Sequence, residues 1–109
     1  MHELGITHEI VALACARAGS AKVKRLVVEI GKLSAILPDA VRFCFDLCTP
    51  DTAAEGATLE IIETVGRGRC RHCRGELAME APLTRCLCGS TDIEWLSGEE
   101  LKIKEMEIC

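Results

Sequence analysis

The sequence predicts an α+β fold in which two helices pack on a small three-stranded sheet and a cysteine-rich lobe is inserted. Two segments have the apolar spacing of helices, and three have the alternation of strands. Four of the eight cysteines are clustered between residues 70 and 88. At 109 residues, the chain is long enough for one small domain, or for a domain with a minor appendage.

The first helix is predicted over residues 3–18. Gly19 stops it, and its apolar stripe contains Leu4, Val11, Ala14 and Ala18. Glu3 lies in the first turn, where a negative charge stabilises a helix N-terminus. The second helix begins at Pro38, a residue that suits a first helical turn, and ends before Pro50.

Strands are predicted over Val23–Leu33, over Ala57–Val65 and from Leu101 onward. Val27 breaks the alternation of the first strand, which indicates that this strand is covered on both faces. The alternation of the last strand changes phase near Lys104, which indicates a bulge or a change of partner. We expect this strand to return to the first sheet. Residues 1–66 and 97–109 then form one domain, and residues 67–96 form the inserted lobe.

The lobe carries two closely spaced thiol pairs, Cys70-x-x-Cys73 and Cys86-x-Cys88, with twelve residues between them. Two such turns can surround one tetrahedral ion, and the expected ion is Zn(II) with no open position. The second pair has a single intervening residue, so His72 and Asp92 are alternative fourth ligands, and redox or disulfide use is a further alternative. A lobe this short cannot form a core alone, and we therefore expect its folding to be coupled to zinc binding.

The remaining cysteines are interpreted as packing residues. Cys44 and Cys48 lie one turn apart on the apolar side of the second helix, and Cys15 is similar. Cys109 ends the sequence and is expected to be mobile.

Charge and hydropathy exclude several classes of protein. The net charge is −4 and both signs are mixed, which argues against a nucleic-acid-binding face. No stretch is long enough to span a membrane. Acidic residues replace the basic start of an export signal, so we expect a cytoplasmic protein, in which clustered cysteines bind metal.

The first three residues form a second candidate metal site. The free amine of Met1 and the amide and imidazole of His2 would chelate one ion, and the amide or carboxylate of Glu3 would add a fourth donor. This nitrogen-rich set suits Ni(II) or Cu(II). The alternative is an ordinary frayed terminus. His8, two turns further along, is interpreted as a surface residue.

Several blocks together resemble the HypA family of hydrogenase nickel-incorporation proteins, which includes HybF. The blocks are Met1-His2-Glu3-Leu4, Val28-Glu29-Ile30-Gly31-Lys32-Leu33-Ser34, Pro38-Asp39-Ala40-Val41-Arg42-Phe43-Cys44-Phe45, Glu55-Gly56-Ala57, Cys88-Gly89-Ser90 and Ser97-Gly98-Glu99-Glu100-Leu101. No block is decisive by itself, but their order and combination are specific.

The resemblance implies a nickel domain with two helices on a small sheet and an inserted zinc-ribbon-like domain, in a metallochaperone rather than an enzyme. It implies delivery of Ni(II) to the large-subunit precursor of [NiFe]-hydrogenase with a HypB-type GTPase, and in some members service to urease. His2 is then the essential nickel ligand, Glu3 contributes to the site or its surroundings, and Zn(II) is held by Cys70, Cys73, Cys86 and Cys88. We expect a monomer or weak homodimer that binds neither nucleic acid nor membrane. The alternative functions are a zinc-ribbon module for protein interaction or nucleic-acid binding, and a small metallohydrolase or thiol oxidoreductase.

Overall fold

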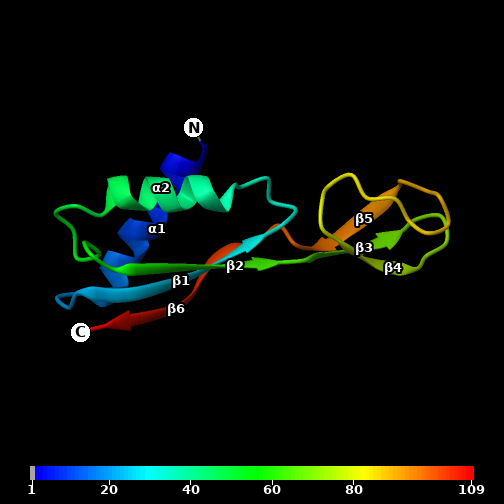
Figure 1. The fold of residues 1–109 in the computed structure, drawn as a ribbon. Coiled ribbons are helices and arrows are strands. Elements are labelled where there is room, and N and C mark those ends of the chain that lie inside the picture. Colours follow the sequence, from blue (N-terminus) through cyan, green and yellow to red (C-terminus); the bar gives the residue numbers. More distant parts are fainter. Residues whose placement is uncertain (1) are drawn as a thin grey trace. The chain divides into compact units, whose positions relative to one another are not determined.

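The structure is a computed structural model that describes residues 2–109. This part of the chain contains two helices and six strands (Figure 1). In chain order they are α1 (His2–Ala18), β1 (Val23–Gly31), α2 (Pro38–Cys48), β2 (Thr58–Thr64), β3 (Gly66–Cys70), β4 (Glu76–Met79), β5 (Ile93–Ser97) and β6 (Leu101–Ile108). The predicted α+β class is therefore confirmed, with both helices starting within a residue of the predicted positions.

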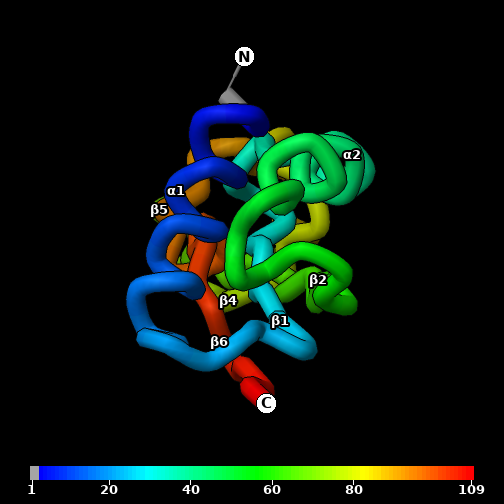
Figure 2. The backbone as a smooth tube through the Cα atoms, turned by 90° about the vertical axis from the view of Figure 1, so that its left-hand side faces the viewer, coloured from blue at the N-terminus to red at the C-terminus, as the bar shows by residue number. Residues whose placement is uncertain are grey.

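The first sheet has the strand order β2-β1-β6, so the last strand returns to the first sheet as predicted. The two helices lie on the same side of this sheet (Figure 1) and pack against each other (Figure 2). In the described residues 2–109, no helix combines the length and the apolar character needed to cross a membrane.

The central strand β1 is buried on both faces, as its sequence predicted. Leu26 and Val28 are 0% exposed on one face, and Val27 is 2% exposed on the other. The face of Val27 carries two groups of ion pairs that reach across the sheet. Arg25 pairs with Glu60, Glu105 and Glu107, and Glu29 pairs with Lys102 and Lys104. On β6, Lys102 and Lys104 reach this face, and so do Glu105 and Glu107. The residues that face this side are thus even-numbered up to Lys104 and odd-numbered from Glu105, which confirms the predicted change of phase near Lys104.

The chain divides into two compact units. The helix-bearing unit contains residues 1–29, 36–62 and 102–109, and the cysteine-bearing unit contains residues 30–35 and 63–101. Each unit thus combines segments that are far apart in the sequence.

The cysteine-bearing unit has its own antiparallel sheet with the order β4-β3-β5. The glycine-rich segment of β3 was not expected to form a strand. It does so because its glycines face a crowded interior: a Cβ on Gly68 would lie 2.6 Å from the Met79 sulfur. The alternation of buried Gly66, Gly68 and Cys70 with exposed arginines is the period of two that could have revealed this strand.

Three segments of the cysteine-bearing unit meet at Gly31, Gly66 and Gly98, a set that we call the glycine junction. A Cβ on Gly31 would overlap the carbonyl group of Gly98, and a Cβ on Gly98 would overlap the Cα of Gly66. Gly98 also has a φ of 115°, which side chains other than glycine rarely adopt. The junction therefore depends on the absence of side chains at these positions.

Gly31→Ala is expected to lower the stability of the protein by at least about 3 kcal/mol, because the clash is with backbone atoms that no rotamer change can relieve. Gly5 in α1 provides a matched control, since a Cβ there would have no neighbour within 4 Å. Gly5→Ala is expected to raise stability by about 0.5–1 kcal/mol through its helix propensity. Urea unfolding followed by circular dichroism measures both. An unchanged midpoint for Gly31→Ala would contradict this description of the junction.

Candidate metal centre

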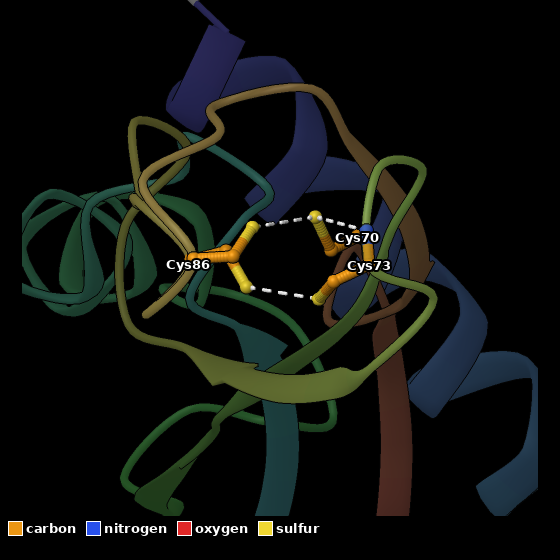
Figure 3. Close-up of side chains that lie close together, drawn as sticks. Cys70, Cys73 and Cys86 are labelled. Atoms are coloured by element: carbon orange, nitrogen blue, oxygen red, sulfur yellow. Dashed lines mark hydrogen bonds between the residues drawn. The ribbon is translucent and has the colours of Figure 1, made fainter.

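Four cysteine thiols converge in the cysteine-bearing unit. Cys70 is the last residue of β3, Cys73 lies in the turn that follows, and Cys86 and Cys88 lie in the loop between β4 and β5. The four sulfurs all lie within 4.8 Å of one another. Figure 3 shows Cys70 and Cys73 facing Cys86 across the centre. The structure therefore brings together all four thiols predicted from the two pairs.

The turn after β3 is shaped by hydrogen bonds to sulfur and to the backbone. The Cys73 amide donates to the sulfur of Cys70 at 3.5 Å, and the Gly75 amide donates to the sulfur of Cys73 at 3.4 Å. The Cys70 amide donates to the carbonyl of Gly75 at 2.9 Å, which closes the turn. Arg74 adopts a φ of 65° within it. Backbone amides aimed at sulfur stabilise thiolates, which are the form that binds metal.

The second turn has a different construction because only one residue separates its cysteines. The Gly89 amide donates to the carbonyl of Cys86 at 2.9 Å, and the Cys86 amide donates to the carbonyl of Ser90 at 2.9 Å. Gly89 has a φ of 94°, a value that glycine adopts without strain. This glycine allows the short spacing to fold into a turn that aims both sulfurs at the first pair.

The surroundings of Cys70 and Cys88 give these two thiols different pKa values. The Cys73 amide lowers the pKa of the Cys70 thiol to about 6, in opposition to desolvation, which raises it. The Ser90 amide acts to lower the pKa of the Cys88 thiol, but desolvation and the neighbouring sulfurs outweigh it and raise that pKa to about 11. Cys70 therefore ionises at a lower pH than Cys88. A bound cation would favour deprotonation of the remaining thiols, because a thiol that coordinates a metal releases its proton to solvent.

The spacing of the sulfurs fits a tetrahedral ion. In a zinc–thiolate tetrahedron with bonds of about 2.3 Å, the sulfurs are about 3.8 Å apart. The sulfurs of Cys70 and Cys88 are 3.6 Å apart, as are those of Cys73 and Cys86. Four sulfur donors in this arrangement suit zinc or iron.

The two residues considered as alternative fourth ligands lie outside the four-sulfur group. His72 is exposed. The carboxylate of Asp92 accepts a hydrogen bond from the Arg71 guanidinium at 2.8 Å, and the Arg71 amide donates to the carbonyl of Asp92 at 3.0 Å. These two contacts join the first turn to the segment after the second. Sequence reasoning missed this link, although complementary charges flanking the two thiol pairs are a signal for it.

Within residues 2–109, the four-sulfur group does not include the other four cysteines, which are Cys15, Cys44, Cys48 and Cys109. Cys44 is buried in α2, as predicted, and Cys48 is half-buried beside it. Burial, with the neighbouring Cys44, raises the pKa of the Cys48 thiol, so this thiol stays protonated at neutral pH. Cys15 is half-buried and Cys109 is exposed.

The amino-terminal candidate site is only partly described. Met1 and the side chain of His2 lie outside the described residues, whereas the His2 backbone begins α1. The carboxylate of Glu3 accepts a long hydrogen bond of 3.5 Å from the Leu37 amide. Leu37 is the N-cap of α2 and provides no side-chain cap of its own. The negative charge of Glu3 therefore lies at the N-terminus of α2, where it is favourable. His8 is exposed on α1, as predicted.

The helix-bearing sheet and the four-thiol unit define a small two-part α+β protein with the donor set of a metal-binding protein. The family model for HypA, described as hydrogenase/urease nickel incorporation, metallochaperone, matches residues 1–108. This chain belongs to the HypA family. It is 59% identical over 108 residues to the hydrogenase maturation factor HypA of Nostoc punctiforme, with coverage of 99% of this chain and 96% of the relative. The corresponding protein of Crocosphaera subtropica is 56% identical over 109 residues, with the same coverage.

A solved structure has the same fold. The Ni metallochaperone HypA from Helicobacter pylori, determined in solution, aligns with a TM-score of 0.69 and 23% sequence identity. The alignment covers 97% of this chain and 96% of that one. The predicted family and fold are thus both confirmed, and the family is one of maturation factors rather than of catalysts.

Proposed function

We propose that this chain is a nickel carrier that binds Ni(II) at its amino terminus and holds Zn(II) at its four clustered cysteines. Nickel is the cargo and zinc is the resident, structural ion. The observation that carries the proposal is the combination of membership of a nickel-incorporation family with a closed four-thiol group far along the chain from the amino terminus. The thiol group supports a permanent ion, so the transient ion needs a different site.

The start of α1 supplies donors for nickel. The first amides of a helix have no intrahelical hydrogen-bond partner, so the amides of His2 and Glu3 are free of that ladder. With the amine of Met1 and the imidazole of His2, they form the planar nitrogen set that Ni(II) favours. Nickel must displace protons from these groups, so we expect its affinity to fall as the pH falls.

The nickel site is proposed to consist of amide, amine and imidazole nitrogens, with the Glu3 carboxylate outside it. This carboxylate already lies at the N-terminus of α2, beside the Leu37 amide. Glu3→Gln removes the charge but keeps the Glu3 amide, so it is expected to change nickel affinity by less than about threefold, or about 0.7 kcal/mol. Calorimetric titration with Ni(II) measures the affinity. A loss of more than tenfold would place the carboxylate in the coordination shell.

The cysteine group is proposed to hold one zinc ion through Cys70, Cys73, Cys86 and Cys88. A four-thiolate zinc site has no open position, so its role is to stabilise the small unit around it. We propose that the zinc-binding function belongs to residues 67–96 and the nickel-binding function to residues 1–66 and 97–109.

A nucleic-acid-binding function for the same unit is not favoured by its charges. Three arginines of β3 and the following turn are paired with carboxylates: Arg67 and Arg69 with Glu76, and Arg71 with Asp92. Arginines neutralised in this way do not form the concentrated basic face that phosphate binding requires.

The cargo is proposed to be delivered to the large-subunit precursor of [NiFe]-hydrogenase in the cytoplasm, with a HypB-type GTPase as partner and urease as a further recipient. We propose that the carrier acts as a monomer or weak homodimer. The family description and the names of the relatives support the recipient class.

Nickel binding to untagged, zinc-loaded protein tests the proposal. Equilibrium dialysis is expected to give one equivalent of nickel with zinc fully retained. Nickel that binds only as zinc leaves would show that the two ions compete for the cysteines, and the proposed division of sites would be wrong.

A further inference from the structure

Leu33 lies two positions beyond the end of β1, yet it belongs to the core of the cysteine-bearing unit. Its side chain is 3% exposed. It forms one buried cluster with Cys70, Met79, Cys86 and Ile93. Two members of this cluster are candidate zinc ligands. An apolar side chain from the early part of the sequence thus packs among residues that lie beside and within the metal centre.

The backbone around Leu33 is held by hydrogen bonds to two later segments. The amides of Gly31 and Leu33 donate to the carbonyls of Glu100 and Gly98, at 2.7 and 2.8 Å. Between them, the Lys32 amide donates to the carbonyl of Thr64 at 2.9 Å. Successive amides of this segment therefore alternate between a partner before β3 and a partner after β5.

The glycine junction holds the Leu33 side chain closely on two sides. A Cβ on Gly66 would lie 2.6 Å from the Cγ of Leu33, and a Cβ on Gly98 would lie 3.1 Å from the same atom. The Leu33 side chain is therefore tightly packed on these two sides. A close-packed core transmits displacements, so a displacement of Cys70 or Cys86 is expected to change the packing of Leu33.

A second side-chain contact of the segment is an exposed ion pair. The Lys32 ammonium forms an ion pair of 2.6 Å with Glu80, whose side chain is 71% exposed. Exposed ion pairs contribute little to stability. Burial of Leu33, by contrast, places an apolar side chain of residues 30–35 inside the cysteine core.

We propose that Leu33 couples the metal occupancy of the cysteine cluster to the end of β1, so that a bound metal orders the Gly31–Leu33 segment. The inference rests on the proposed metal site. When the metal leaves, the cysteine core loosens, Leu33 loses its packing partners, and the Gly31 and Leu33 hydrogen bonds open more often. Linkage makes the effect reciprocal, so docking of Leu33 increases retention of the metal.

Hydrogen exchange of the full-length chain tests the coupling. In the wild type, removal of zinc is expected to raise exchange at residues 30–35 by at least about tenfold, because local opening controls amide exchange. In Leu33→Ala, exchange there is expected to be fast with zinc bound and to change less than about twofold on zinc removal. Leu37→Ala is the matched control, since Leu37 is 64% exposed, and it is expected to behave as the wild type.

Zinc release to a chromogenic chelator is the second readout. Leu33→Ala is expected to release zinc at least about tenfold faster than Leu37→Ala, because it leaves a cavity beside Cys70 and Cys86. Leu33→Met conserves volume and is expected to keep both the slow release and the metal-dependent exchange, which separates loss of packing from failure to fold.

Two results would overturn the coupling. One is wild-type hydrogen exchange at residues 30–35 that does not change when zinc is removed. The other is a Leu33→Ala variant in which exchange at these residues still depends on zinc as in the wild type. A wild type that binds neither zinc nor cobalt would instead contradict the proposed metal site. In that case, the packing role of Leu33 is tested in the metal-free chain, where Leu33→Ala is expected to raise hydrogen exchange in β3 and β4. Unchanged exchange in those strands would overturn it.

Discussion

His2→Gln is expected to abolish the nickel site of the zinc-loaded protein, lowering nickel affinity by at least about 100-fold, or about 2.7 kcal/mol. The substitution removes the imidazole, the one side-chain nitrogen of the proposed set, while zinc content stays at one equivalent. Glutamine is preferred to alanine, because a small second residue promotes removal of Met1 and would change the amine as well. Calorimetry with Ni(II) on untagged protein measures the effect.

The chain provides a matched control in His8, which is exposed on the same helix. His8→Gln removes an equivalent imidazole and is expected to leave nickel affinity within about twofold of the wild type, or about 0.4 kcal/mol. Equal nickel binding by His2→Gln and the wild type would move the cargo to the cysteines or to His72. The proposed carrier mechanism would then be wrong, although membership of the family would stand.

Cys73→Ser is expected to lower zinc affinity by at least about 1,000-fold, or about 4 kcal/mol. A hydroxyl is a poor substitute for a thiolate, and the folding of this small unit is coupled to the ion. Elemental analysis after dialysis measures zinc content, and hydrogen exchange of β3, β4 and β5 measures loss of structure in the unit.

Cys109→Ser is the control for this experiment, because Cys109 is exposed and lies outside the four-sulfur group. It is expected to retain one zinc per chain. Retention of zinc by Cys73→Ser, with unchanged exchange in β3–β5, would show that the ion is held by fewer cysteines than proposed.

Much of the fold was predictable from the spacing of apolar residues and from the residues that start and end helices. The stripe of α1, the start of α2 at Pro38 and the double-sided burial of β1 all follow from local rules on apolar spacing and backbone conformation. Even the phase change in β6 was visible in its alternation, because the side chains on each face of a strand have a period of two.

The interior of the cysteine-bearing unit was less accessible. The segment that became β3 is rich in glycine, which is depleted in strands, so local propensity argues against it. The structure overrides propensity there because Met79 and Ile93 leave no room for a side chain at Gly68. Leu33 was predicted to end the first strand, but β1 ends at Gly31 and Leu33 lies two positions beyond it. Its membership of the cysteine core is a contact between distant parts of the chain that local patterns do not report.

At both candidate metal sites, the ligand residues were predictable from the sequence, whereas their contacts with other segments were not. The four cysteines were predictable because two closely spaced thiol pairs are typical of the ligands of one tetrahedral zinc ion. The unequal acidity of Cys70 and Cys88 was not, because it depends on which backbone amides point at each sulfur. At the amino terminus, the contact between Glu3 and Leu37 joins two helices and is not visible in either segment alone.

X-ray absorption spectroscopy at the nickel and zinc edges of protein loaded with one equivalent of each metal is the most direct test of the division of labour between the sites. The proposed function predicts nickel surrounded by nitrogen donors, and zinc surrounded by four sulfurs at about 2.3 Å. Sulfur in the nickel shell, or nitrogen in place of sulfur at zinc, would contradict it.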